Sequence, residues 1–182
     1  MTVNGRPAET TTTAFRSIIL IGPPGTGKTT VGTALAARLH VSFTDTDAVV
    51  SAAAGKPVSD IFVTDGEPEF RRLERAAVAA VLADRDGVIG LGGGAVLDEQ
   101  TRVRLLGQRV VYLQTGFSEL AKRVGLDRAR PLLIGTNPRA QLKALLDQRL
   151  PVYDSLAWLT IGTDGRDPDE IAAEIAVAVT RP

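Results

Sequence analysis

The feature that most constrains the fold is the glycine-rich stretch GPPGTGKTT at residues 22–30. It follows an apolar run at residues 16–21 (RSIILI), typical of a buried parallel strand, and leads into residues 28–39, whose apolar positions recur on one helical face. Glycines in such a turn let backbone N–H groups surround an anion, and the helix presents its positive end to the same place. The stretch predicts a phosphate-binding loop, in which Lys28 contacts the β- and γ-phosphates of ATP and the Thr29 hydroxyl ligates Mg²⁺.

The rest of the chain alternates strand-like apolar runs with amphipathic helical segments. Further strands are expected at residues 41–44, 88–91, 110–113 and 157–161. Helices are expected at residues 47–54, 58–62, 68–83, 98–106, 117–124, 138–153 and 168–179. This alternation predicts an α/β three-layer sandwich with a mostly parallel sheet of about five strands, as one domain over residues 16–182. Residues 1–15 lack the apolar stretch of a secretory signal and are expected to form a loose tail.

Charge and cysteine content argue against several classes of function. Lys+Arg and Asp+Glu number 21 each, so no overall field attracts nucleic acid or an anionic membrane. No apolar run is long enough to span a bilayer. The absence of cysteine excludes disulfides and thiolate metal sites and suits a reducing cytoplasm. The few aromatic residues, Trp158 among them, are expected in the core.

The loop alone does not separate motors from kinases, because GPPGTGKT is also typical of AAA-type ATPase modules. In that alternative, residues 96–99 (VLDE) form a Walker B strand whose acids hold Mg²⁺ and activate water. Their position argues against it, because the apolar strand at residues 88–91 has already ended and Asp98 suits the N-cap of the next helix. The motor alternative predicts ATP hydrolysis without an acceptor, and oligomerisation on ATP.

Two carboxylates follow the second predicted strand, in the sequence Asp45-Thr46-Asp47. The carboxyl ends of parallel strands are where ligands bind in such folds, so both acids are expected near the phosphate loop. One acid can serve Mg²⁺ while the other contacts an acceptor hydroxyl. A strand end followed by a helix N-cap explains the same residues equally well, and on the residues alone both interpretations stay open.

Taken together, the motifs of the chain resemble those of the shikimate kinase family. They are GPPGTGKTT, DTD, DIFVTDGEPEFRRLE, LGGGAV, RPLL at residues 130–133, and Arg149 ahead of PVY. Their order and spacing agree with the family from about residue 17 to residue 179. The resemblance implies a P-loop kinase fold with a mobile lid and a monomeric enzyme that uses ATP and Mg²⁺. It also implies the conversion of shikimate to 3-phosphoshikimate, in the biosynthesis of chorismate and aromatic amino acids.

Two arginines match the family's carboxylate-binding positions. These are Arg71 and Arg149, and a guanidinium fork suits the planar carboxylate of shikimate. Glu74 lies three residues after Arg71 on the same helical face and is expected to fix the orientation of that arginine. Arg72 is expected to face elsewhere, as a surface charge.

Other acceptor contacts follow from the same resemblance, which places the acceptor-binding region at about residues 45–75. Asp47 matches the acid that contacts the acceptor hydroxyls, and Asp45 matches the acid near Mg²⁺. Residues 92–94 match a stretch where the backbone approaches the substrate. The implied substrate-binding set is Asp47, Arg71, Gly92, Gly93, Gly94 and Arg149, and the implied metal set is Thr29 and Asp45.

The nucleotide contacts implied by the resemblance come from the loop and from later segments. Residues of about 123–137 match the lid that closes over ATP, and Arg130 within it would stabilise charge on the moving phosphoryl group. The implied ATP-binding set is Gly25, Thr26, Gly27, Lys28, Thr29, Thr30, Arg123, Arg130, Arg166 and Pro168, and the implied catalytic set is Lys28, Asp47 and Arg130. Kinases for gluconate or for a nucleoside monophosphate share the loop but need different acceptor residues.

Overall fold

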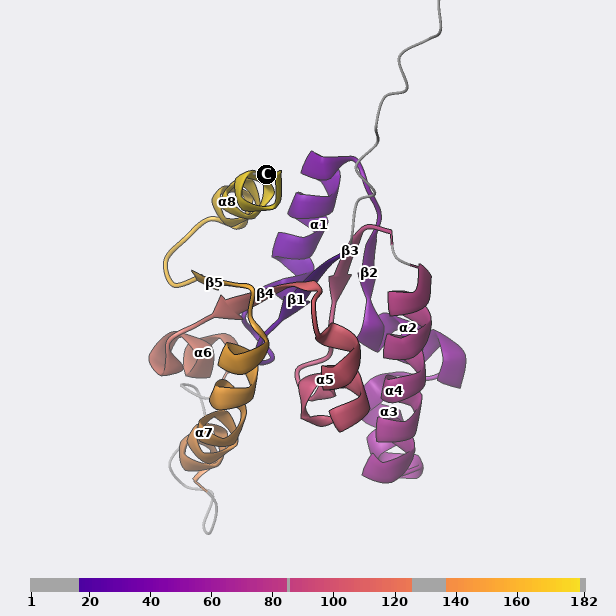
Figure 1. Cartoon of the computed structure of the whole chain (residues 1–182). Coiled ribbons are helices and arrows are strands. Elements are labelled where there is room, and N and C mark those ends of the chain that lie inside the picture. The colour runs from indigo at the N-terminus through magenta and orange to yellow at the C-terminus, as the bar shows by residue number, and fades with distance from the viewer. Residues whose placement is uncertain (1–16, 85, 126–136, 181–182) are drawn as a thin grey trace, which may run out of the picture.

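Five parallel strands form the centre of the molecule, with helices on both faces (Figure 1). The computed structural model describes residues 17–84, 86–125 and 137–180. The strand order is β2-β3-β1-β4-β5, and every neighbouring pair is parallel. The strands are β1 (Ile18–Ile21), β2 (Phe43–Asp45), β3 (Val88–Gly90), β4 (Arg109–Gln114) and β5 (Leu159–Gly162). The predicted α/β fold is confirmed.

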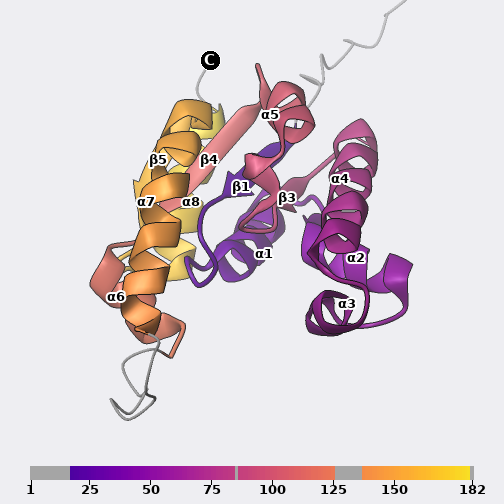
Figure 2. The ribbon, with the colours of Figure 1, turned by 90° about the horizontal axis from the view of Figure 1, so that it is seen from below.

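Successive side chains of β1 point to opposite faces of the sheet, and all of them are apolar. Helices therefore pack on both faces. Ile18 and Leu20 pack with α1 and α8, whereas Ile19 and Ile21 pack with α4, α5 and α7 (Figure 2). The helical elements are α1 (Lys28–Leu39), α2 (Thr46–Ala54), α3 (Val58–Thr64), α4 (Glu67–Asp84), the 3₁₀ turn η1 (Ala95–Leu97), α5 (Glu99–Leu105), α6 (Phe117–Arg123), α7 (Pro138–Leu156) and α8 (Pro168–Thr180). Within the described ranges, none of these helices is long and apolar enough to cross a membrane.

A separate apolar cluster joins α2, α3 and α4 beside the β2 edge of the sheet (Figures 1 and 2). Val50, Ile61, Phe70 and Ala77 are its buried members. This cluster shares no buried residue with the two clusters that cover the sheet faces. The helices of the predicted acceptor region therefore have a small core of their own.

Three details differ from, or decide between, the sequence-based expectations. The second strand lies at Phe43–Asp45 rather than at residues 41–44, because it pairs with β3 in a register that sets Asp45 opposite Gly90. Val96 and Leu97 lie in η1, and the Asp98 carboxylate accepts a hydrogen bond from Thr101 N–H at 2.9 Å, so VLDE is a helix start and not a strand. The expectation that the aromatic residues lie in the core was wrong for Trp158 and Phe62, which are 49% and 39% exposed.

Candidate active site

The phosphate loop lies between the carboxyl end of β1 and the first turn of α1. Gly22 has a φ of 145°, and a Cβ there would lie 2.7 Å from the Leu113 carbonyl oxygen. Gly27 precedes α1 in a left-handed conformation with a φ of 92°. The loop can close against β4 and enter the helix in this way because glycines stand at both positions.

Lys28 folds back over its own loop. Its Nζ donates hydrogen bonds to the carbonyl oxygens of Gly22 at 2.8 Å and Pro23 at 2.9 Å. Burial lowers the pKa of Lys28 to about 8, against the opposing effect of the Asp47 and Asp45 charges. The hydrogen bonds of the Lys28 ammonium group go to carbonyl oxygens and not to a carboxylate. A bound polyphosphate could therefore replace these two contacts.

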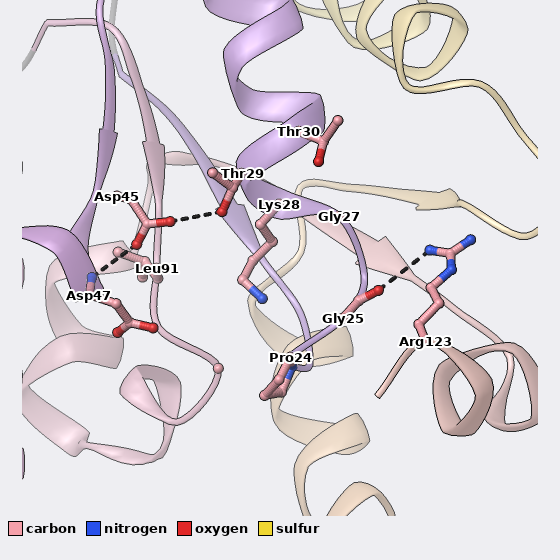
Figure 3. A pocket seen from close by; sticks show the side chains of 11 residues that line it. Pro24, Gly25, Gly27, Lys28, Thr29, Thr30, Asp45, Asp47, Leu91 and Arg123 are labelled. Carbon is pink, nitrogen blue, oxygen red and sulfur yellow. Dashed lines mark hydrogen bonds between the residues drawn. The ribbon is translucent and has the colours of Figure 1, made fainter. Parts of the chain in front are cut away.

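Thr29 and Asp45 form the candidate metal site. The Thr29 hydroxyl donates to Asp45 Oδ2 at 2.9 Å, while Asp45 Oδ1 accepts the Asp47 N–H at 3.0 Å and caps α2 (Figure 3). Asp45 is therefore an N-cap and also faces the loop. Hydroxyl and carboxylate oxygens are the ligands that Mg²⁺ prefers. No group of three or more His, Cys, Asp or Glu residues suited to a metal occurs among the described residues, so phosphate oxygens and water would supply the remaining ligands.

Asp47 points toward the same place without a partner. Its Oδ1 is buried and has no hydrogen bond within the described ranges. Burial, and then the nearby Asp45 charge, raise the pKa of Asp47 above its usual value of 3.8. A buried polar atom left unpaired in this way is suited to a ligand. The cavity beside it has a volume of about 430 Å³ (Figure 3) and is lined by Pro24, Gly25, Gly27, Lys28, Thr29, Thr30, Asp45, Asp47, Leu91, Gly93 and Arg123.

The three glycines after β3 let Asp47 and Arg71, both predicted to bind the acceptor, come close to the backbone. A Cβ on Gly92 would lie 2.5 Å from Asp47 Oδ1 and 2.7 Å from Glu74 Oε1. A Cβ on Gly94 would lie 2.4 Å from Arg71 Nη1. These approaches are shorter than van der Waals contact, so the absence of side chains here is what lets Asp47, Glu74 and Arg71 surround one segment.

Gly92→Ala should therefore disturb the site without changing its charge. The added methyl group must displace two buried carboxylates, and we expect a loss of about 1–3 kcal/mol in the free energy of unfolding. We also expect kcat to fall at least about tenfold, since displaced reacting groups lose orientation. Urea unfolding and steady-state assays measure both. Gly162→Ala is the control, because a Cβ there meets nothing within 4 Å; equal losses in both variants would contradict the assignment.

Arg71 is held by two acids on its own helix. It donates to Glu74 at 2.6 Å and to Glu67 at 3.1 Å. Glu74 is only 3% exposed, and its burial raises its pKa while Arg71 opposes that shift. This is the orienting contact expected for Glu74, whereas sequence reasoning left Glu67 without a role in the site. Arg72 pairs with Glu69 on the outside of the helix, as expected.

Arg149 is the second predicted carboxylate ligand, and it contacts the glycine triplet. It projects from α7, and its Nη1 donates to the Gly93 carbonyl oxygen at 3.4 Å. Tyr153, one turn further along α7, donates its hydroxyl to the same oxygen at 2.5 Å. Gly93 also lies against the phosphate loop, since a Cβ there would be 2.7 Å from Pro24 Cδ. The sequence indicated Tyr153 only as part of a motif and not as a contact.

The predicted nucleotide contacts meet at a second cavity, of about 280 Å³, which shares Gly25, Gly27, Thr30 and Arg123 with the first. Arg123 joins the loop to the segment after β5, because it donates to the carbonyl oxygens of Gly25 at 3.5 Å and Thr163 at 3.2 Å. Thr163 was missed by sequence reasoning. Arg130 lies outside the described residues, as does most of the predicted lid at residues 123–137. The cavity is lined by Gly25, Thr26, Gly27, Thr30, Val31, Arg123, Thr163, Arg166, Pro168 and Ile171.

A phosphate-binding loop on the central strand of a parallel sheet, facing a buried carboxylate across a cavity, defines the chain as a P-loop phosphotransferase. The family model described as shikimate kinase matches residues 24–180. The chain belongs to the shikimate kinase family, whose members are ATP-dependent kinases. The motor alternative is also disfavoured by the helical position of VLDE.

Similar proteins cover nearly the whole chain. A shikimate kinase of Thermobifida fusca is 63% identical over 158 residues, which are 87% of this chain and 91% of the relative. A shikimate kinase of Saccharopolyspora erythraea is 56% identical over 162 residues, which are 89% of this chain and 93% of the relative. The structure of a shikimate kinase from Acinetobacter baumannii in complex with shikimate has a TM-score of 0.82 and 34% identity, and covers 91% of this chain and 93% of that chain.

Proposed function

We propose that this chain transfers the γ-phosphoryl group of ATP to the 3-hydroxyl of shikimate, giving ADP and 3-phosphoshikimate. The observation that carries the proposal is that Asp47 and Lys28 line one cavity, while the buried Oδ1 of Asp47 has no hydrogen-bond partner among the described residues. Arg71 and Arg149 both lie against the adjoining glycine triplet, at Gly94 and Gly93, and provide the cations for a carboxylate. The Acinetobacter baumannii relative, solved in complex with shikimate, supports this choice of acceptor.

Positioning and charge do most of the work in this mechanism. The acceptor hydroxyl oxygen attacks the γ-phosphorus, the bond to the β–γ bridging oxygen breaks, and the hydroxyl proton passes to Asp47. The raised pKa of Asp47 makes it a better proton acceptor than an exposed aspartate. Lys28 stays on the transferred phosphate oxygens throughout.

We also assign the metal and the nucleotide. Thr29 and Asp45 would hold Mg²⁺, which when bound neutralises phosphate charge and orients the transferred group. The phosphates occupy the loop of residues 25–30, and the adenine lies at the cavity lined by Arg123, Arg166 and Pro168. Arg130 is proposed to close onto the phosphates with the lid, which excludes water as a competing acceptor.

The remaining assignments concern the protein as a whole. We propose that residues 16–182 act as one catalytic domain and that residues of about 45–75 bind the acceptor; residues 1–15, expected from the sequence to form a tail, lie outside the described residues. We further propose a cytoplasmic monomer without nucleic-acid or membrane partners. Light scattering in solution should give a mass near 19.2 kDa, with and without ATP.

The decisive experiment measures ADP release by the purified protein with Mg-ATP. Shikimate, gluconate and a nucleoside monophosphate are supplied in parallel, with a sample that lacks any acceptor. Release that depends on shikimate, with a 3-phosphate identified by phosphorus NMR, supports the proposal. ADP release at the same rate with and without every acceptor would support the AAA-type ATPase alternative. ADP release that depends on gluconate or on the nucleoside monophosphate would show a kinase for that acceptor.

Arg71→Lys should weaken the acceptor site selectively. A lysine keeps the charge beside the buried Glu74 but loses the guanidinium fork, so the KM for shikimate should rise about tenfold or more. The KM for ATP should stay within about twofold, because Arg71 lines neither nucleotide cavity. Arg72→Lys is the matched control on the same helix, where the side chain is 61% exposed. An unchanged KM for shikimate would remove Arg71 from the carboxylate site.

A further inference from the structure

One backbone carbonyl in the site receives two hydrogen bonds from α7. The Gly93 oxygen accepts the Tyr153 hydroxyl at 2.5 Å and Arg149 Nη1 at 3.4 Å. Tyr153 is fully buried, and its ring stacks on Tyr112 with centroids 5.2 Å apart and an interplanar angle of 19°. Packing therefore fixes the position of the Tyr153 ring independently of its hydrogen bond.

The carbonyl that Tyr153 holds lies between two others that are already bonded, because the Gly92 and Gly94 oxygens accept hydrogen bonds from Ala95 and Leu97 N–H. Gly93 stands between Gly92 and Gly94, and glycine backbones rotate with little steric resistance. The described residues contain no cis peptide bond, and in a planar trans peptide the C=O and the following N–H point in opposite directions. Fixing the Gly93 C=O toward α7 thus turns the Gly94 N–H away from α7.

The same peptide connects the two halves of the site. Gly93 lines the cavity of Lys28 and Asp47 and lies against Pro24 of the phosphate loop. Burial raises the pKa of Tyr153 to about 12, so its hydroxyl is protonated and donates at neutral pH. The hydrogen bond from Tyr153 therefore holds a peptide that lies between the predicted acceptor residues and the phosphate loop.

We propose that Tyr153 is a positioning residue for phosphoryl transfer, which locks the Gly93–Gly94 peptide and through it the distance between the acceptor and the phosphate loop. This inference rests on the proposed function of the site. Tyr153 need not touch either substrate: its effect passes through one carbonyl oxygen that it shares with Arg149. Loss of the hydroxyl should free the peptide to rotate and leave the reacting groups less well aligned.

The test compares Tyr153→Phe with Tyr112→Phe. Both variants remove a buried hydroxyl and keep the stacked rings, but the Tyr112 hydroxyl has no hydrogen-bond partner among the described residues. For Tyr153→Phe we expect kcat to fall about tenfold and the affinity for ATP to stay within about twofold. The nitrogen-15 resonance of the Gly94 amide should shift without any substrate present, because the Gly93 carbonyl loses a hydrogen bond. Tyr112→Phe should change neither quantity.

The outcomes separate this inference from the proposed function. A kcat for Tyr153→Phe within about twofold of the unaltered chain overturns the inference, as does an equal loss in Tyr112→Phe. A lower thermal midpoint with unchanged kcat and an unchanged Gly94 resonance would show a structural role alone. If the unaltered chain does not phosphorylate shikimate, the proposed function fails, and the Gly94 resonance still decides whether Tyr153 fixes this peptide.

Discussion

Replacing Lys28 by methionine should lower kcat about 10³-fold or more with every acceptor, equivalent to about 4 kcal/mol of transition-state stabilisation. The reason is geometric, since Lys28 Nζ already lies among the loop carbonyls and is the cation that a bound γ-phosphate would meet. Methionine keeps the length of the side chain and removes the charge. A coupled assay of ADP formation with saturating shikimate measures the loss.

Stability provides the control for this variant. Because the pKa of Lys28 falls from 10.5 to about 8 on folding, the unfolded chain binds more protons between these values, and the contribution of this lysine to stability rises with pH across that window. Below about pH 8 the buried charge is a penalty, so Lys28→Met should melt no lower than the unaltered chain at pH 7. Lys143→Met, at an exposed ion pair on α7, should retain full activity. Retained activity in Lys28→Met would contradict the placement of the phosphates.

Asp47→Asn should lower kcat about 10²- to 10³-fold while the substrates still bind. Asparagine has the same shape but cannot take the hydroxyl proton. Because the pKa of Asp47 is raised, the acid limb of the kcat/KM profile should lie above the usual range of an aspartate, with activity lost as pH falls through that limb. The variant should lack the limb. Rates measured from pH 4 to pH 9 in both proteins test this.

Asp47→Asn should increase the stability of the fold although it lowers kcat. A carboxyl with a raised pKa stabilises the fold when protonated, and that contribution is lost as pH rises through its folded-state pKa. One oxygen of Asp47 is buried and unpaired, and burial penalises the charged carboxylate, so Asp47→Asn should raise the thermal midpoint measured above the folded-state pKa of this group. Asp154→Asn on α7 serves as the control for removing an acidic charge. A variant that is both inactive and less stable would indicate a structural role for Asp47.

The phosphate loop and the layer architecture could be predicted because local sequence determines them. The buried strand, the glycines and the helix face are contiguous, so the pattern at residues 16–39 was sufficient to place Lys28 and Thr29. Asp98 was likewise recognised from local sequence as the N-cap of a helix, and the prediction that VLDE is not a strand was correct. The spacing of Arg71 and Glu74 on one helix also gave their contact.

Contacts between distant segments were the part that sequence reasoning could not supply. The hydrogen bond from Tyr153 to Gly93 spans 60 positions, and it depends on how α7 packs against η1 and β4. The link from Arg123 to Thr163 spans 40 positions. Neither contact leaves a periodic pattern or a motif in the sequence, because each residue fits its own helix or loop without reference to its partner. The exposure of Trp158 was misjudged for the same reason, since burial at a sheet edge depends on which helix covers it.

The location of β1 has a consequence for how the two substrates affect the protein. All four of its residues are at most 1% exposed, and the strand pairs on both sides. The loop that it carries can come apart only when the whole sheet does, so a nucleotide bound there is linked to global unfolding. Beside the β2 edge, the buried apolar residues of α2 and α3, Val50 and Ile61, belong only to the separate cluster, whereas α4 also contributes Val78 to the core of the sheet. We therefore expect ATP to stabilise the whole fold against unfolding, and an acceptor held beside α2 and α3 to act on a more local opening.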